Sequence, residues 1–193
     1  FNRIVHPNDV DKFIHIPINH ELNAIESSDS ISYSLEEIDV KVSTGPVVDF
    51  RLKEHLCFNP QKGTVPLIYP AHFSDQNIIW PKIGIKKPNA IKRNIDTDKW
   101  LYPNGYYCVV RRFSSKEEKR RIVANVIDPA TLNNAEVIGL ENHLNVYHDG
   151  KKGLPELLAR GLAVYLNSTA VDDNFRRSSG HTQVNATDLK KMK

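Results

Sequence analysis

The pattern of hydrophobic and polar residues predicts strands in several stretches of the chain. Residues 38–42 carry apolar side chains at every second position, and residues 105–110 and 121–127 are rich in strand formers. A period of two residues is typical of β-strands. The charged run 114–120 lies between the last two stretches, which predicts a hairpin with a long, charged connection. We expect a further strand at residues 144–147, after a short loop or helical turn.

The period changes near the C-terminus. Apolar residues recur at helical spacing over residues 154–167, namely Leu154, Leu157, Leu158, Leu162, Tyr165 and Leu166. This pattern predicts a helix, and Pro155 suits its first turn. Gly161 falls among the apolar positions, so we expect close packing there against a neighbour. A short segment ending in Arg176 and Arg177 follows, and then a small helix capped at Thr187 or Asp188.

The remaining segments are irregular. A turn is expected at residues 43–46, with extended structure resuming at 47–50. Prolines restrict 65–70 and 78–81 to edge or irregular positions in a sheet. Residues 82–104 are rich in Lys, Pro and Asn without a period, which predicts a long loop. The expected fold class is α+β, with irregular mixed strands, a long C-terminal helix and short helices.

Length and composition narrow the class of protein. The 193 residues, 40% of them hydrophobic, suffice for one sizeable core. No apolar run approaches the 18 or so residues of a membrane span. Cys57 and Cys108 form neither a disulfide framework nor a zinc pattern, which favours reduced thiols and a cytoplasmic location. Because the chain begins at Phe1, we expect a fragment in which residues 1–37 are an N-terminal arm or the remnant of a preceding domain.

Charge is unevenly distributed along the chain. Residues 1–40 hold two basic and eight acidic side chains, whereas residues 82–121 hold twelve basic and four acidic. Residues 122–150 contain no Lys or Arg, and residues 151–193 hold eight basic against four acidic. Two basic blocks on a chain of net charge +3 suggest a face for a polyanion. A solvated surface, or a protein-interaction module whose basic face meets an acidic partner, is the alternative.

The basic blocks supply candidate contacts to DNA phosphates, which Lys and Arg neutralise. These candidates are Lys86, Lys87, Lys92, Arg93, Arg111, Arg112, Lys116, Lys119, Arg120, Arg176 and Arg177. Amide, hydroxyl and imidazole groups are candidates for base or sugar contacts. They are Asn89, Asn94, His181, Thr182, Gln183 and Asn185, with residues 43–45 as a weaker DNA-side loop. Trp80, Trp100 and Tyr102 flank the basic loop and are expected mainly to anchor it to the core.

Signals for an enzyme are weak. The chain has no glycine-rich phosphate loop and no nucleophile elbow. His143 and His148 are five residues apart on opposite faces of an extended segment, which is poor geometry for a metal pair. Glu117-Glu118-Lys119 matches half of a nuclease motif but lies in a hydrophilic run rather than an apolar strand. A metal-dependent nuclease domain therefore stays an alternative, and no catalytic residue, metal ligand or cofactor contact is assigned in this chain.

Several segments together resemble a known family. They are STGPVVDFR (Ser43 to Arg51), VPLIYPAHF (Val65 to Phe73), IIWP (Ile78 to Pro81), YYCVVRRFSSKEEKRRIVANV (Tyr106 to Val126), LENHLNVYH (Leu140 to His148), LARGLAVYLNST (Leu158 to Thr169) and GHTQVNATDLKKM at the end. This series resembles the C-terminal part of XhoI-type adenine-specific DNA methyltransferases of bacterial restriction-modification systems. The ending is also similar to target recognition domains of TaqI-type methyltransferases and of type I specificity subunits.

The resemblance implies a role in reading DNA. Members of that family bind S-adenosylmethionine in a separate domain whose catalytic signature is Asn-Pro-Pro-Tyr. Here Asn59-Pro60 is followed by Gln61, so the signature is absent. The resemblance therefore implies a non-catalytic DNA target recognition domain at residues 38–193. Its partners would be double-stranded DNA and the methyltransferase domain of the same parent chain.

Overall fold

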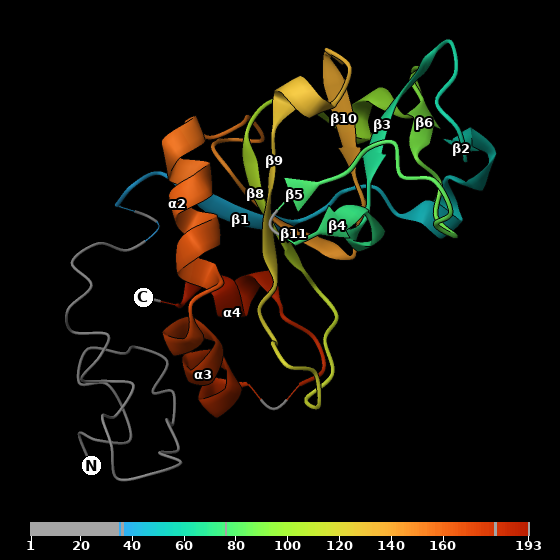
Figure 1. Cartoon of the computed structure of the whole chain (residues 1–193). Coiled ribbons are helices and arrows are strands. Elements are labelled where there is room, and N and C mark those ends of the chain that lie inside the picture. Colours follow the sequence, from blue (N-terminus) through green and yellow to red (C-terminus); the bar gives the residue numbers. More distant parts are fainter. Residues whose placement is uncertain (1–34, 36, 76, 180, 193) are drawn as a thin grey trace, which may run out of the picture.

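The computed structural model describes residue 35 and residues 37–75, 77–179 and 181–192. Two β-sheets and three α-helices make up this part of the chain (Figure 1). The expected α+β fold class is confirmed. The predicted N-terminal arm, residues 1–37, lies almost entirely outside the described residues. Among the described residues, no helix is long and apolar enough to cross a membrane.

The first sheet is six-stranded and mixed. Its strands, in spatial order, are β1 (Lys41–Thr44), β11 (Leu144–His148), β8 (Tyr107–Arg111), β9 (Ala124–Ile127), β5 (Asn77–Ile78) and β4 (Phe73–Ser74). The predicted hairpin is confirmed, because β8 and β9 pair antiparallel from Tyr107 opposite Ile127 to Val110 opposite Ala124. The expected strand at residues 144–147 is confirmed as β11, which pairs with β1. The strand expected at residues 38–42 begins only at Lys41 and continues to Thr44, so that β1 takes in the first two residues of the turn expected at 43–46.

The second sheet is five-stranded. Its strands, in spatial order, are β2 (Leu56–Cys57), β6 (Ala90–Lys92), β3 (Thr64–Ile68), β10 (Val137–Leu140) and β7 (Leu101–Pro103). Short 3-10 helices connect the strands, namely η1 (Asp49–Arg51), η2 (Lys53–His55), η3 (Pro70–His72), η4 (Asp98–Trp100) and η5 (Pro129–Thr131). Residues 82–104 are thus not one long loop, as predicted, because they contain β6, η4 and β7. Likewise η1 replaces the extended structure expected up to residue 50.

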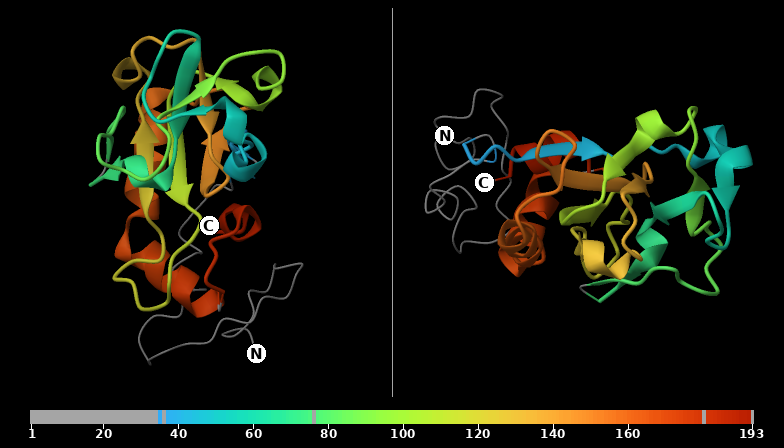
Figure 2. Two further views of the ribbon diagram at one scale, coloured as in Figure 1. Left: turned by 90° about the vertical axis from the view of Figure 1, so that its right-hand side faces the viewer. Right: turned by 90° about the horizontal axis from the view of Figure 1, so that it is seen from above.

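Both faces of the first sheet are buried. Cys108 and Val110 of β8 point into a core shared with the helices, whereas Tyr107 and Val109 point into a core shared with the second sheet. Alternate positions of one strand therefore meet two different layers, which is why β8 is apolar from Tyr107 to Val110. The view from above in Figure 2 shows the helices on one side of the first sheet and the second sheet on the other.

The helices cover one side of the first sheet. They are α2 (Glu156–Leu166), α3 (Thr169–Ser178) and α4 (Ala186–Lys190). The predicted helix at residues 154–167 is confirmed as α2, which buries Leu162 and Leu166. The predicted close packing at Gly161 is wrong, since a Cβ built there would meet no atom within 4 Å. Leu157 and Val164 on the same outward side are 85% and 70% exposed.

One strand contradicts the expectation drawn from proline. Strand β3 contains Pro66 but lies in the interior of its sheet, between β6 and β10. The amide of Leu67 donates to Asn89 O on the β6 side. Because successive amides point to opposite sides of a strand, the nitrogen of Pro66 faces β10, whose pairing with β3 begins only at Leu67. The missing N–H therefore removes no ladder hydrogen bond.

Candidate nucleic-acid interface

The long connection of the β8–β9 hairpin, residues 112–123, is pinned to α3 by a buried carboxylate. Oδ1 of Asp172 accepts hydrogen bonds from the backbone amides of Arg121 (2.7 Å) and Ile122 (2.8 Å). Oδ2 accepts from Nε of Arg176 at 2.8 Å. Burial acts to raise the pKa of Asp172, but these hydrogen bonds prevail and lower it. One side chain thus fixes the course of the connection.

The same connection is joined to the C-terminal polar segment. The amide of Ser114 donates to Thr182 O (3.1 Å), and the amide of Val184 donates to Arg112 O (2.7 Å). Phe113 and Gln183 form an isolated antiparallel β-bridge between the connection and this segment. Two regions singled out separately in the sequence are therefore neighbours. We call residues 111–121, 176–177 and 181–185 together the hairpin group (lower part of Figure 1).

Most arginines of the hairpin group are turned toward the protein. Arg176 donates from Nε to Asp172 and from its two terminal nitrogens to Lys116 O (3.0 Å) and Glu118 O (2.8 Å). Arg120 donates to Ser168 O at 2.7 Å, and Arg111 pairs with Glu118. These three side chains therefore hold the fold together. In Arg176 each of the three guanidinium nitrogens donates one hydrogen bond within the protein.

Other predicted contacts of this group differ in how exposed they are. Lys116, Lys119, His181 and Thr182 are exposed, whereas Arg112, Arg177, Gln183 and Asn185 are half-buried. The guanidinium of Arg112 lies 5.7 Å from the ring centroid of Phe113 and donates to Asn142 O. Asn185 is the N-cap of α4, and its backbone amide donates to Asp188 Oδ2 at 3.1 Å. The expected cap at Thr187 or Asp188 is therefore wrong by two or three residues.

The second set of candidates lies on and beside the second sheet, and we call residues 82–94 the loop group. Lys86 is exposed, and Lys87 pairs with Asp49 at 2.8 Å. Lys92 is exposed and donates to Glu54 O. Arg93 is exposed and pairs with Asp98 and with Glu136.

Asn94 serves its own turn. Its Oδ1 accepts from the amides of Asp96 (3.0 Å) and Thr97 (3.2 Å), and its Nδ2 contacts His55 Nδ1. Asn is favoured in turns because its side chain can bond backbone amides a few residues further along the chain.

Asn89 is buried and joins neighbouring segments of the backbone. Its side chain is buried, accepts from the amide of Lys82 at 2.8 Å and donates to Lys82 O and to Phe58 O. His72 Nε2 lies 3.0 Å from its Oδ1. The predicted base contact at Asn89 is therefore wrong, because every polar atom of the side chain is used within the protein. The bonds hold the two ends of loop 82–89 together.

The aromatic residues near this loop behave largely as expected. Trp80 donates from Nε1 to Asn89 O at 2.5 Å, and Tyr102 is buried in the core. Trp100 is 37% exposed, with Lys99 Nζ 5.3 Å from its ring centroid. The weaker candidate loop at residues 43–45 is also tied inward. Ser43 Oγ lies 2.9 Å from His148 Nε2, and Gly45 packs directly on the backbone of Glu141.

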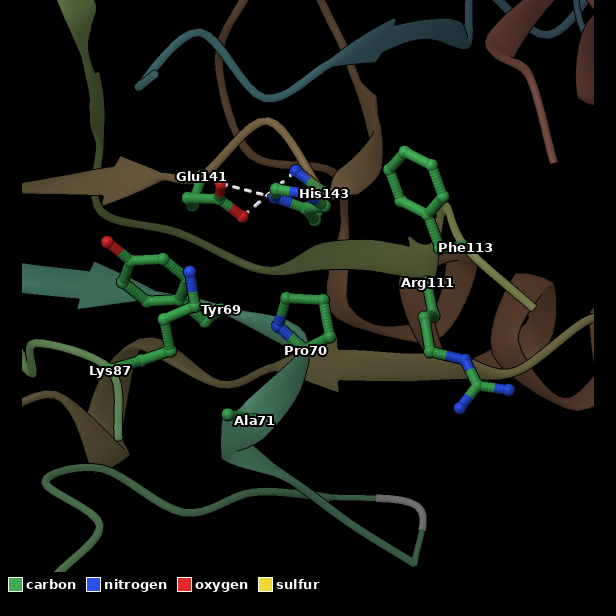
Figure 3. A pocket seen from close by; sticks show the side chains of 8 residues that line it. All are labelled: Tyr69, Pro70, Ala71, Lys87, Arg111, Phe113, Glu141 and His143. Atoms are coloured by element: carbon green, nitrogen blue, oxygen red, sulfur yellow. Dashed lines mark hydrogen bonds and ion pairs between the residues drawn. The ribbon is translucent and has the colours of Figure 1, made fainter. Parts of the chain in front are cut away.

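A pocket lies between the loop group and the hairpin group (Figure 3). Its volume is about 250 Å³, and it is lined by Tyr69, Pro70, Ala71, Lys87, Arg111, Phe113, Glu141 and His143. Lys87 belongs to the loop group and Arg111 to the hairpin group, so the pocket connects the two sets of basic residues. Its lining is mostly apolar and aromatic between these cations.

A carboxylate–histidine pair forms one wall of this pocket. The side chain of Glu141 has no exposed surface, and its two oxygens accept from Nδ1 (2.5 Å) and the backbone amide (2.9 Å) of His143. Burial raises the pKa of Glu141, although the hydrogen bonds from His143 oppose the shift. The ring of His143 lies 5.0 Å from that of Phe113, centroid to centroid. Sequence reasoning missed this pair because it considered His143 only alongside His148.

The residues considered for enzymatic chemistry are not brought together. His148 is buried and bonded to Ser43 and to the amide of Lys151, and burial lowers its pKa. Glu118 accepts from Arg111 and from the amide of Ser115. Across the described residues, no group of three or more His, Cys, Asp or Glu side chains could hold a metal ion.

Comparison with known proteins shows which proteins this chain is similar to. The chain is 58% identical over 193 residues to the Type II methyltransferase M.BsuBI of Bacillus subtilis. It is 44% identical over 194 aligned positions to the Type II methyltransferase M.PstI of Providencia stuartii. Over its whole length, this chain matches part of a Type II methyltransferase. It spans 38% of the length of each relative. The predicted methyltransferase resemblance is confirmed. No family model and no solved structure matches the chain.

Proposed function

We propose that residues 38–193 are the DNA target recognition domain of an adenine-specific DNA methyltransferase in a bacterial restriction-modification system. The observation that carries the proposal is the similarity of this whole chain to part of two Type II methyltransferases. The arrangement of basic side chains in two groups supports it, since duplex DNA is the polyanion on which a DNA methyltransferase acts. The domain positions the target adenine for methylation and works in the bacterial cytoplasm.

In this proposal the two groups bind the DNA backbone and the C-terminal segment reads bases. Lys86, Lys92, Lys116 and Lys119 are exposed and can reach phosphates. Phosphate contacts of this kind position a protein without reading the sequence. His181, Thr182 and Gln183 lie beside the hairpin connection and present imidazole, hydroxyl and amide groups, which suit hydrogen bonds to base edges or sugars.

The chemical step belongs to another part of the parent protein. The relatives are more than twice as long as this chain. We propose that the remainder carries the methyltransferase domain and binds S-adenosylmethionine, and that this chain is non-catalytic. The outward side of α2 supports a contact between the two parts, because Leu157 and Val164 expose apolar surface there. Such exposed apolar positions are typical of interaction sites when they lie together.

The first test is the binding of this chain to a random-sequence DNA duplex, followed by fluorescence anisotropy from about 20 to 200 mM salt. We expect the affinity to fall steeply as salt rises. Lys119→Ala should flatten the slope of log K against log salt by about 0.9, the value for one lost phosphate contact in B-DNA. Lys152→Ala is the matched control, because this exposed lysine lies at the other end of the first sheet.

The outcomes separate the proposal from its alternatives. Absence of binding at the lowest salt would contradict the DNA-reading role and would turn attention to protein partners. A second pair of variants tests the division of labour. Gln183→Ala should relax specificity at one base pair, whereas Lys92→Ala should weaken all sequences alike. Equal losses with an unchanged salt slope would refute these two roles.

A further inference from the structure

The pocket between the loop group and the hairpin group suits a ligand of defined chemistry. We propose that it binds a single nucleobase of the DNA that has left its stack, with Glu141 as the positioning residue for His143. This inference rests on the proposed function and adds a second kind of DNA contact to it. Three observations carry it, namely the aromatic lining, the buried acid–histidine pair, and the cations at opposite sides.

The shape and lining fit one planar ring system. The volume of about 250 Å³ lies just below the roughly 300–1,000 Å³ of pockets for drug-sized ligands. The rings of Phe113 and His143 lie on one side, with Tyr69 and Pro70 opposite (Figure 3). Phe113 is 40% exposed although it follows a buried strand. Bases stack on aromatic side chains whatever their sequence, because every base has a π-face.

The acid–histidine pair provides a fixed hydrogen-bonding group. Glu141 is fully buried, and a buried carboxylate persists only when it is well paired. Its bond to Nδ1 of His143 holds the imidazole ring in place. In the proposed pocket Nδ1 donates to Glu141, and Nε2 accepts a hydrogen bond from the base. An acceptor recognises the exocyclic amino groups of adenine and cytosine, and thymine lacks such a group.

The charges at the two sides of the pocket match a nucleotide flanked by phosphates. Lys87 lies over the ring of Tyr69 at 5.1 Å, and Arg111 lies on the opposite side beside Phe113 (Figure 3). A base that leaves its stack brings a phosphate on each side of its sugar. Both cations are paired with partly exposed carboxylates, those of Asp49 and Glu118. Because these pairs are partly solvated, exchanging one partner for a phosphate costs little.

The test compares three duplexes of otherwise identical sequence by anisotropy. One is fully matched, one carries a single bulged adenine, and one carries an abasic residue in place of that adenine. Unstacking costs least for an unpaired base. We expect the chain to prefer the bulged adenine over both other duplexes on the order of tenfold, the scale of one base–aromatic stack.

Variants assign the preference to the pocket. Phe113→Ala should remove most of it, and Phe113→Leu, which keeps apolar volume without the ring, should do the same. Phe58→Ala is the matched control, since this phenylalanine is 62% exposed outside the pocket. His143→Ala and Glu141→Gln should abolish discrimination between a bulged adenine and a bulged thymine. A merely structural role of Glu141 would change stability without changing this base preference.

Each result has one meaning. Equal affinity for the matched, bulged and abasic duplexes, with salt-dependent binding intact, would overturn the pocket assignment and leave the proposed function standing. Loss of the preference in Phe58→Ala as well as in Phe113→Ala would also overturn it. If the chain binds none of the duplexes, the proposed function fails and the base pocket fails with it.

Discussion

Asp172 organises the hairpin group, and its removal gives the sharpest test of the structure. This carboxylate lies on α3 with its side chain 6% exposed. It accepts two backbone hydrogen bonds from residues 121 and 122 and one from the side chain of Arg176. Arg176 in turn donates to two carbonyl oxygens of the connection. The perturbation we consider is Asp172→Ala.

The expected cost follows from the groups left without partners. Two buried amides lose their acceptor, at about 1–3 kcal/mol for each unsatisfied group. Arg176, whose side chain is 28% exposed, loses its counter-ion, which adds about 0–1 kcal/mol because solvent screens the pair. These contributions overlap because they share one carboxylate. We therefore expect the free energy of unfolding to fall by about 3–5 kcal/mol.

Urea unfolding followed by tryptophan fluorescence measures this change directly. The matched control is Asp173→Ala, which removes the same charge one residue further along α3 from an exposed position. The control should change stability by less than about 0.5 kcal/mol, as is usual for surface substitutions. In thermal unfolding, the Asp172 variant should melt about 6–20 °C lower, at roughly 2–4 °C per kcal/mol for a chain of this size.

The pH dependence gives an independent check of the same carboxylate. Hydrogen bonds hold the pKa of Asp172 below its usual value in the folded chain. Its stabilisation is therefore fully present above the unfolded pKa of about 3.9 and is lost as pH falls through the lower folded value. The difference in stability between wild type and Asp172→Ala should shrink below about pH 4. Equal stability of the two alanine variants at neutral pH would refute the anchoring role.

Further predictions concern packing, reactivity and the basic loop. Gly45→Ala should destabilise the chain by about 1–3 kcal/mol, because the added Cβ would lie 2.2 Å from the backbone oxygen of Glu141. Gly161→Ala should stabilise the chain by up to about 1 kcal/mol, because this position of α2 has open space for a Cβ. Urea unfolding of both variants tests the contrast. Cys57 should react with a thiol reagent much faster than Cys108, which is fully buried and whose pKa burial raises, and equal rates would contradict this. Asn89→Ala should cost about 2–4 kcal/mol, since several buried partners lose their bonds, and should increase hydrogen exchange across residues 82–89.

Local patterns predicted the local elements of the fold. The hairpin of β8 and β9 follows from two short runs of strand formers, and the helix α2 follows from a period of 3.6 residues. Both are properties of short windows. Strand β10 was missed, because Gly139 interrupts its short apolar run. The glycine is there for a tertiary reason, since a Cβ would lie 2.8 Å from Leu67. Gly161 was misjudged for the converse reason, because apolar residues of α2 also occupy the outward side.

The candidate interface was predicted by residue type but not by arrangement. Basic and polar residues at 111–121 and 176–185 were singled out separately, and Asp172 brings them together from a position that had drawn no attention. Asn89 has the composition of a base reader, yet its side chain closes a loop from within. The wall formed by Glu141 and His143 depends on two residues that are two positions apart at a sheet junction, and no motif marks them.

We propose that this chain reads DNA sequence. The most direct measurement is selection from a library of duplexes with a randomised centre, using the chain as the binding partner at low salt, followed by sequencing of the retained DNA. We expect enrichment of one short motif. Gln183→Ala should relax one position of that motif, and Lys152→Ala should relax none. Retention of DNA with no enriched motif would contradict a recognition role and leave a non-specific basic surface.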